Sequence, residues 1–445
     1  MIQRFFRNLF FTNRLIRILI GLVCFFLFTY FLPDLLELGI IALVVLFLLV
    51  CIDILLLFRS SDALAAERRM ADIFSNGDDN AVTILLKSNY PFKISVSILD
   101  ELPIQFQLRD HRLKADVDPG AERQLRYLLR PLTRGEYWFG AINVMSRSPL
   151  GLVDRRWVFD AARMVMVWPS FHALRHYELL AHNATTSGTG NRKIRKLGHS
   201  LEFEEIKDYV AGDDLRTVNW KATARKGSLM VNNFMDERSQ QIYCVIDKSR
   251  VMKMPYNGMT LLDYAINASL VLSRIALLKY DKAGLICFDE KMGTVVPADR
   301  KGTQMNVLAE SLYRQQTNFL EADYEKLVTL VKGKIKHRSL LILFTNFESK
   351  SNLLRQLPYI RSLAKKHLLL VVFFENTSLL ELTGKTAEHL EDVYIKTIAE
   401  KFLSEKRWMV KELQKYGITS ILTPPHLLTT QTINKYLELK ARQII

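Results

Sequence analysis

Two long runs of apolar residues near the start of the chain differ from the alternating patterns that follow them. Residues 15–32 and 35–58 are almost entirely apolar, and Pro33 and Asp34 separate the two runs. Each run is close to the ~20 residues that a helix needs to cross ~30 Å of hydrocarbon. The pattern therefore predicts a transmembrane helical hairpin over residues 1–60.

The charges around this hairpin predict its orientation. Arginines flank both outer ends, whereas the connecting loop carries Asp34 and Glu37 and no positive charge. Because Lys and Arg concentrate on the cytoplasmic side of membrane proteins, we expect both ends and the soluble remainder to be cytoplasmic. A cleaved signal peptide would not be followed directly by a second span. Asp53, near the cytoplasmic end of the second run, is expected to reach the interface, and we predict no function for it.

Residues 75–182 alternate between apolar and polar positions over short segments. Examples are NAVTILLKS at 80–88 and FKISVSILDEL at 92–102, and turn signals such as Asp118-Pro119-Gly120 interrupt the series. This spacing is typical of half-buried antiparallel strands. We therefore expect a β-sandwich of immunoglobulin-like type here. Residues 183–240 then form a linker, rich at first in Gly, Ser, Thr and basic residues, and a distinctive segment considered below.

Residues 241–445 alternate between short apolar strands and amphipathic helices. The strands expected at 242–247, 339–346 and 368–375 are apolar throughout, as in a parallel sheet that helices cover on both faces. The segment is therefore predicted to be a doubly wound α/β domain. Ligands of such domains bind beyond the carboxyl ends of the strands, and the polar residues there are Asp247 to Ser249 and Thr345 to Asn346.

Composition narrows the function classes. The 445 residues carry a formal net charge of +15, but the basic residues are scattered and form no aromatic-interleaved stripe, so no nucleic acid partner is expected. The four cysteines show neither a disulfide framework nor a metal-ligand spacing. The chain also lacks a phosphate-binding loop, a His-Glu-x-x-His motif and a Gly-x-Ser-x-Gly motif. These features favour a protein that is not an enzyme.

The segment YVAGDDLRTVNWKATARKGSL at 209–229 admits a structural interpretation. In it, Glu202 to Val210 is a helix closed by Gly212, and Asp213 or Asp214 caps a second helix over Leu215 to Arg225. Trp220 would then bury its ring. The polar residues would serve to stabilise the joint between two domains.

A catalytic interpretation of the same segment remains open. Glu205 and Lys207 fit half of a divalent-metal nuclease motif, and Asp154 or Asp213 could supply the other carboxylate. The alternative function is therefore a metal-dependent hydrolase, a nuclease or phosphoesterase, centred on Asp213, Asp214 and Glu205.

The same segment resembles the signature of the bacterial family of unknown function numbered fifty-eight, and the run RGEYWFGAINVMSRSPLGL at 134–152 is similar to a second feature of that family. Members resemble partners of MoxR-type AAA+ ATPases that take part in chaperone-like assembly or envelope stress tolerance. The resemblance implies a location in the bacterial inner membrane, with other envelope or client proteins as possible partners. The matching signature residues are Glu202, Phe203, Tyr209, Gly212, Asp213, Asp214, Arg216, Asn219, Trp220, Lys221, Ala224 and Arg225.

The α/β segment resembles a von Willebrand factor A domain, whose metal site holds magnesium through hydroxyls and carboxylates. Asp247 and Ser249 match its first two ligands, and Thr317 is a third. Val251 replaces the second serine, and Asn346 stands where an aspartate is usual. A hard dication prefers charged or multiple oxygen ligands, so the resemblance implies at most a degenerate magnesium site. Taken together, we expect a membrane-anchored scaffold or adaptor.

Overall fold

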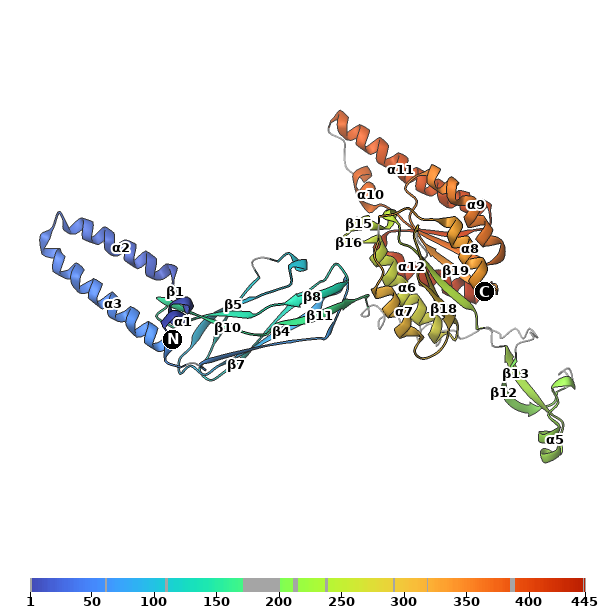
Figure 1. Cartoon of the computed structure of the whole chain (residues 1–445), viewed down its shortest axis with the longest axis horizontal. Coiled ribbons are helices and arrows are strands. Elements are labelled where there is room, and N and C mark those ends of the chain that lie inside the picture. The colour runs from blue at the N-terminus through green and yellow to red at the C-terminus, as the bar shows by residue number, and fades with distance from the viewer. Residues whose placement is uncertain are drawn as a thin grey trace. The chain divides into compact units, whose positions relative to one another are not determined.

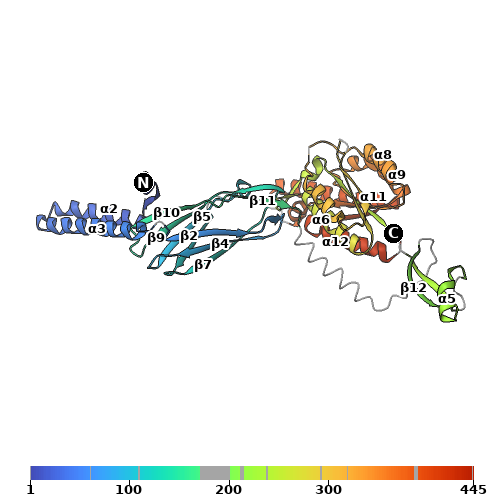
Figure 2. The same cartoon turned by 60° about the horizontal axis from the view of Figure 1, so that its bottom comes forward.

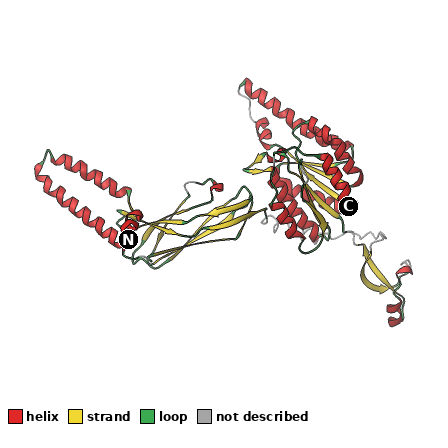
Figure 3. Ribbon diagram, viewed as in Figure 1, coloured by secondary structure: helices red, strands yellow, loops and turns green. Residues whose placement is uncertain are grey.

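The protein, a computed structural model, falls into two compact units, Met1–Ser170 and Phe171–Ile445. Figure 1 labels the helices and strands of the chain, and Figure 3 colours them by type. The residues that the structure describes are 2–60, 62–108, 111–170, 201–210, 215–236, 239–290, 293–317, 319–384, 389–442 and 444.

The first unit begins with a helical hairpin. Helices α2 (Asn13–Thr29) and α3 (Leu36–Phe58) lie side by side in both views, joined by the short helix η1 (Pro33–Leu35) (Figures 1 and 2). The hairpin is preceded by α1 (Ile2–Asn8) and β1 (Leu9–Phe11). Both predicted spans are helical, although the first helix ends three residues before the predicted limit.

Two described helices are long and apolar enough to cross a membrane, α3 and the helix α6 (Leu261–Leu278). They differ in burial, because α3 is mostly exposed whereas α6 is mostly buried inside the second unit. The core helix of a soluble domain passes the same test of length and composition, as α6 does. The exposed apolar surface of α3 therefore points to association with a membrane, and α6 does not.

The rest of the first unit consists of three β-sheets around one core. Their strand orders are β1-β10-β9-β5-β6, β3-β11-β8 and β2-β4-β7. Ile84, Ile98, Val144 and Val165 come from all three sheets and are fully buried in the same cluster. The predicted β-rich region is thus present. Its strands are β2 (Leu64–Met70), β3 (Ile73–Ser75), β4 (Asn80–Ser88), β5 (Ile94–Asp100), β6 (Arg112–Val117), β7 (Glu122–Leu129), β8 (Gly135–Phe139), β9 (Ile142–Arg147), β10 (Val153–Phe159) and β11 (Arg163–Trp168).

The second unit contains a six-stranded sheet with the order β18-β17-β14-β19-β20-β21. All neighbours are parallel except β18, which pairs antiparallel with β17. From β14 the chain continues to β17 on one side, and β19 then lies on the other side of β14. The carboxyl ends of β14 and β19 are therefore the topological switch point of the sheet. The strands are β14 (Gln241–Asp247), β17 (Lys282–Phe288), β18 (Val295–Asp299), β19 (Leu340–Phe344), β20 (Leu368–Phe374) and β21 (Thr419–Thr423).

Helices cover both faces of this sheet, as the sequence predicts for a doubly wound domain. Side chains of β14 alternate between two cores: Cys244 packs with α6, α7 and α12, and Val245 packs with α8, α9 and α11. The sequence pattern did not predict α10, α12 and the small hairpin β15–β16. The remaining elements are α7 (Gln304–Tyr313), α8 (Tyr324–Lys334), α9 (Lys350–Lys366), α10 (Thr377–Gly384), α11 (Leu390–Lys415), α12 (Leu428–Ala441), β15 (Pro255–Tyr256) and β16 (Met259–Thr260).

Candidate functional site

The switch point of the sheet gathers the polar residues that the sequence singles out. Asp247 ends β14, and its carboxylate accepts hydrogen bonds from the Ser249 backbone N–H at 2.8 Å and from the Thr345 hydroxyl at 2.7 Å. The Tyr324 hydroxyl, from α8, lies 2.8 Å from the Thr345 hydroxyl. Sequence reasoning did not assign Tyr324 to the site, because its helix lies far from β14 in the chain.

The other expected ligands lie near Asp247 but use their oxygens elsewhere. The Thr317 hydroxyl donates to the Ser249 carbonyl oxygen at 3.4 Å. Asn346 accepts a hydrogen bond at 2.6 Å from the Lys406 ammonium, which comes from α11. The Ser249 hydroxyl is buried, and among the described residues it has no hydrogen-bond partner of normal geometry.

These donors do not match the needs of a dication. Burial raises the pKa of the Asp247 carboxyl, and the nearby Asp289 carboxylate acts in the same direction. No group of three or more His, Cys, Asp or Glu side chains in the described part of the chain could hold a metal ion. An ammonium lies against Asn346, the residue found where a metal-binding aspartate is expected. The geometry therefore adds a physical reason to doubt a magnesium site.

We expect millimolar magnesium to raise the melting temperature by less than about 1 °C, because a weakly bound ion contributes little free energy. The measurement is thermal unfolding of the chain with magnesium and with a chelator. A clear rise with magnesium that Asp247→Ala abolishes would contradict this expectation.

The family signature forms a small module of two strands and one helix. β12 (Leu201–Asp208) pairs antiparallel with β13 (Met230–Asp236), with a register shift between Phe203 and Glu205. The helix predicted over Glu202 to Val210 is therefore wrong, as this segment is a strand.

The helix of this module, α5 (Trp220–Lys226), is shorter than the one predicted. Asn219 caps its start by accepting a hydrogen bond from the Ala222 N–H at 3.0 Å. Gly227 ends it with a φ of 73°, as expected for a glycine in this role. The indole of Trp220 is not buried: the residue is 73% exposed, which contradicts the structural interpretation.

The signature residues lie on several different elements of this module. Tyr209 follows β12 and its N–H bonds the Leu229 carbonyl oxygen, while Lys221, Ala224 and Arg225 lie on α5. Arg216 is in the short helix η3 (Leu215–Thr217). The strand β12 contains Glu202, Phe203 and Glu205. Gly212, Asp213 and Asp214, which include two carboxylates of the hydrolase interpretation, lie outside the described residues.

A second polar site joins the helical hairpin to the β-sheets. Asp53 of α3 is fully buried, and its carboxylate accepts hydrogen bonds from the Leu152 N–H at 2.9 Å and the Val153 N–H at 3.0 Å. The Ser148 hydroxyl also donates to it. The loop between β9 and β10 therefore satisfies the carboxylate within the protein.

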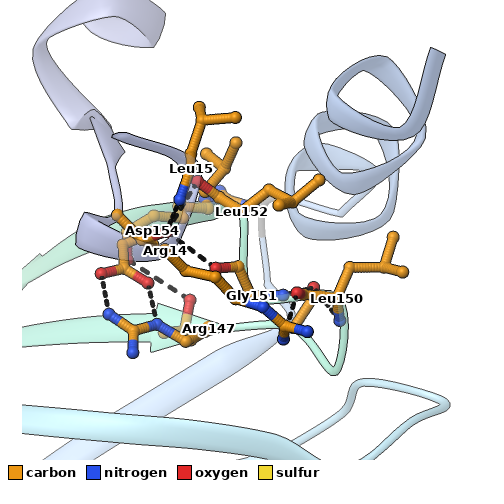
Figure 4. Close-up of polar contacts among 12 residues, drawn as sticks. Arg14, Leu15, Arg147, Leu150, Gly151, Leu152 and Asp154 are labelled. Carbon is orange, nitrogen blue, oxygen red and sulfur yellow. Dashed lines mark hydrogen bonds and ion pairs between the residues drawn. The ribbon is translucent and has the colours of Figure 1, made fainter. Parts of the chain in front are cut away.

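The amino end of α2 contacts the same loop (Figure 4). The Thr12 hydroxyl donates to the Gly151 carbonyl oxygen at 2.8 Å and accepts from the Leu15 N–H at 3.3 Å, and it therefore also caps the helix. The Arg14 guanidinium donates to the Leu150 carbonyl oxygen at 2.9 Å. Gly151 has a φ of 66°, a conformation that favours glycine. We call this loop, Ser148 to Val153, the clamp loop.

Two further side chains of the β-sheets reach the end of α3. The Arg155 guanidinium donates to the carbonyl oxygens of Leu57 at 2.6 Å and Ser60 at 2.8 Å. The Tyr90 hydroxyl donates to the same Leu57 oxygen at 2.9 Å. These bonds satisfy carbonyl groups that a helix end leaves without partners. The hairpin is thus joined to the sheets at both helices.

A comparison with known protein families finds the family that the signature segment resembles. Residues 205–396 match the family described as protein of unknown function DUF58. The matched range includes part of the small module and most of the α/β sheet, so the recognised segment extends beyond the signature itself. The helical hairpin and the three β-sheets of the first unit lie outside the matched range.

One similar protein is the uncharacterized protein YeaD of Bacillus subtilis (strain 168), at 27% identity over 234 residues. The alignment covers 51% of this chain and 55% of YeaD, so it spans about half the length of this relative.

Solved structures offer only slight likenesses. The CARDB domain of PF1109 from Pyrococcus furiosus is 15% identical, with a TM-score of 0.17, and covers 24% of this chain and 94% of that domain. The C-terminal domain of wzt is 10% identical, with a TM-score of 0.18, and covers 24% of this chain and 75% of that domain. At such TM-scores the likeness carries no argument about function.

Proposed function

We propose that this protein is a membrane-anchored scaffold that binds other proteins and catalyses no reaction of its own. The observation that carries the proposal is the joint between the apolar hairpin and the β-sheets. The hairpin exposes apolar side chains along its length, as a bilayer requires. Asp53, Thr12 and Arg14 hold the base of the hairpin through hydrogen bonds to the clamp loop. Such a joint suits a protein that holds a soluble unit at a fixed place on a membrane.

The orientation follows from charge. With arginines at both outer ends of the hairpin, the positive-inside rule favours soluble units on the cytoplasmic side. We expect protease added to intact spheroplasts to leave the chain whole, and protease added to inside-out vesicles to degrade it. Degradation in intact spheroplasts would contradict this orientation.

The α/β domain is proposed to act as a von Willebrand factor A-like binding module. Its antiparallel β18 at one edge and its switch point between β14 and β19 support this assignment, as does the grouping of Asp247, Ser249 and Thr317 at that point. The Asp247 carboxylate and the Thr317 and Thr345 hydroxyls there are used in hydrogen bonds within the protein. Protein binding is therefore favoured over catalysis.

The resemblance of the signature to partners of MoxR-type AAA+ ATPases suggests the main binding partner. We expect the cognate ATPase to co-purify with the chain from solubilised membranes when nucleotide and magnesium are present. A fully active ATPase that never co-purifies, with or without nucleotide, would refute this partnership. A purified chain that cleaves phosphoesters, and loses the activity on Asp214→Asn, would favour the hydrolase instead.

A further inference from the structure

An apolar pocket lies beside the switch point of the α/β sheet. It has a volume of about 310 Å³ and is bounded by the β15–β16 hairpin, the end of β20, α10 and α11. Figure 1 shows β15, β16, α10 and α11 near one another. The volume is at the lower end of the range of ligand pockets, which is about 300–1,000 Å³. Its apolar lining includes Met254, Leu261, Phe374, Leu379, Phe402 and Leu403.

One cation, the ammonium of Lys406, lies in the wall of this pocket. Its hydrogen bond to Asn346 is the one contact of that kind that it makes with described residues, and no carboxylate of the described chain is within ion-pair distance. An ammonium has three N–H donors, so two of them lack a protein acceptor there. Burial lowers the pKa of Lys406 to about 8, and the Glu348 carboxylate opposes this shift. The group is a partly desolvated charge that a carboxylate would stabilise.

A row of apolar side chains leads along α11 to this cation. Leu390, Tyr394, Ile398 and Phe402 follow one another at a spacing of four residues, and Lys406 is the next position in the row. Residues four apart adjoin on the surface of a helix, so the row is continuous and winds gradually around the helix axis. Leu390 is 73% exposed and Phe402, which also lines the pocket, is 42% exposed. The exposed row and the pocket therefore form one continuous apolar surface that ends at a positive charge.

Two glutamates also line the pocket, Glu348 and Glu375. Glu348 is exposed to solvent, so water screens its charge, whereas Glu375, which follows β20, is partly exposed like Lys406. Lys406 is only partly exposed, so an interaction with its ammonium is screened less. A carboxylate entering along the α11 row would meet Lys406 at the inner end of the surface.

We propose that this surface binds an acidic segment of a partner protein, with one carboxylate on Lys406 and flanking apolar side chains over the pocket and the α11 row. This inference rests on the proposed scaffold function and names the chemistry of its recognition site. A protein segment fits better than a free amphiphile, because the apolar row continues well beyond the pocket, over three turns of α11. A small molecule would leave Leu390, Tyr394 and Ile398 uncovered.

The test uses the full chain in nanodiscs, which avoids filling the pocket with detergent. A displayed library of random short peptides is selected on the wild-type chain after depletion on the Lys406→Met variant. We expect the enriched peptides to share an Asp or Glu flanked by apolar residues. Enrichment of basic peptides, or of none above the depleted background, would overturn the proposal.

The best peptide is then measured with Glu and with Gln at the acidic position. We expect the Gln form to bind about tenfold more weakly or worse, as for loss of a charged hydrogen bond. Lys406→Met should remove this difference. The matched control Lys401→Met, on an exposed position of the same helix, should keep it. Equal binding of the two peptides to the wild-type chain would refute the carboxylate contact.

A third variant, Ile398→Ser, separates a protein segment from a small amphiphile. It should weaken both peptides, because it removes apolar area from the row outside the pocket. Decanoate serves as the small amphiphile. If decanoate binds and displaces the peptides, and Ile398→Ser weakens the binding of neither, the occupant is a small amphiphile and the proposal is wrong. None of these measurements involves the ATPase. If the peptides bind but the ATPase does not co-purify, only the proposed ATPase partnership is wrong. If the ATPase co-purifies but the peptides do not bind, only the proposed peptide site is wrong.

Discussion

Replacing Asp100 with alanine is expected to destabilise the β-sheets of the first unit by about 3–5 kcal/mol, the cost of leaving a buried charge without its partner. Asp100 and Arg68 form an ion pair whose side chains are almost entirely buried. The Tyr127 hydroxyl also donates to Asp100. Arg68 further donates to the carbonyl oxygens of Ala161 at 2.8 Å and Gly140 at 3.0 Å. In the variant the guanidinium keeps the two carbonyls but loses its only carboxylate among the described residues.

The measurement is calorimetric unfolding of the full chain in nanodiscs. The matched control is Glu122→Ala, which breaks an exposed pair with Lys87 between β4 and β7. Exposed pairs contribute about 0–1 kcal/mol, so the control should unfold close to the wild type. If the Asp100 and Glu122 variants lost equal stability, the buried network would not have the energetic role assigned to it.

The second large effect is expected at the joint between the hairpin and the sheets. Asp53→Ala removes the acceptor of the Leu152 and Val153 amides and of the Ser148 hydroxyl. The two buried amides left unpaired cost roughly 1–3 kcal/mol each, so we expect the joint to lose at least about 2 kcal/mol. Hydrogen exchange of the clamp loop should accelerate on the order of a hundredfold, because local opening controls exchange.

Exchange is measured by mass spectrometry on the full chain in nanodiscs. Glu37→Ala, an exposed change in the first turn of the same helix, is the control and should leave the clamp loop protected. Asp53→Asn keeps the shape and one acceptor oxygen, so its effect should be intermediate. Rapid exchange of the clamp loop in the wild-type chain would contradict a fixed joint.

The α/β domain was predictable because its strands are buried on both faces. A strand such as Leu368–Phe374 reads as a continuous apolar run, and helices with a 3.6-residue period separate such runs. The predicted strand at 242–247 agrees with β14 to within a residue. In contrast, α12 is rich in Thr and Lys, and its apolar positions are too few to reveal it.

The error at the signature strand has a clear physical cause. The register of β12 shifts between Phe203 and Glu205, which interrupts the two-residue alternation of a strand. Phe203 and Ile206 are then three residues apart, a spacing that also fits a helix. The shift depends on the pairing with β13, about 30 residues later, so it could not be derived from the local pattern.

The joint and the pocket depended on contacts that sequence patterns do not encode. Asp53 was recognised as costly inside an apolar helix, but its partners lie about 100 residues away in the clamp loop. Lys406 is one of many lysines on an amphipathic helix, and only the fold places it beside Asn346. The exposure of Trp220 likewise follows from the small size of its module, not from its own sequence.

The proposed scaffold function is tested most directly by binding at known concentrations. The full chain in nanodiscs is titrated with the purified cognate MoxR-type ATPase, with ATP and magnesium and without them, and empty nanodiscs serve as the control. The account predicts saturable binding to the loaded nanodiscs that depends on nucleotide. An active ATPase that binds loaded and empty nanodiscs equally in every nucleotide state would contradict it.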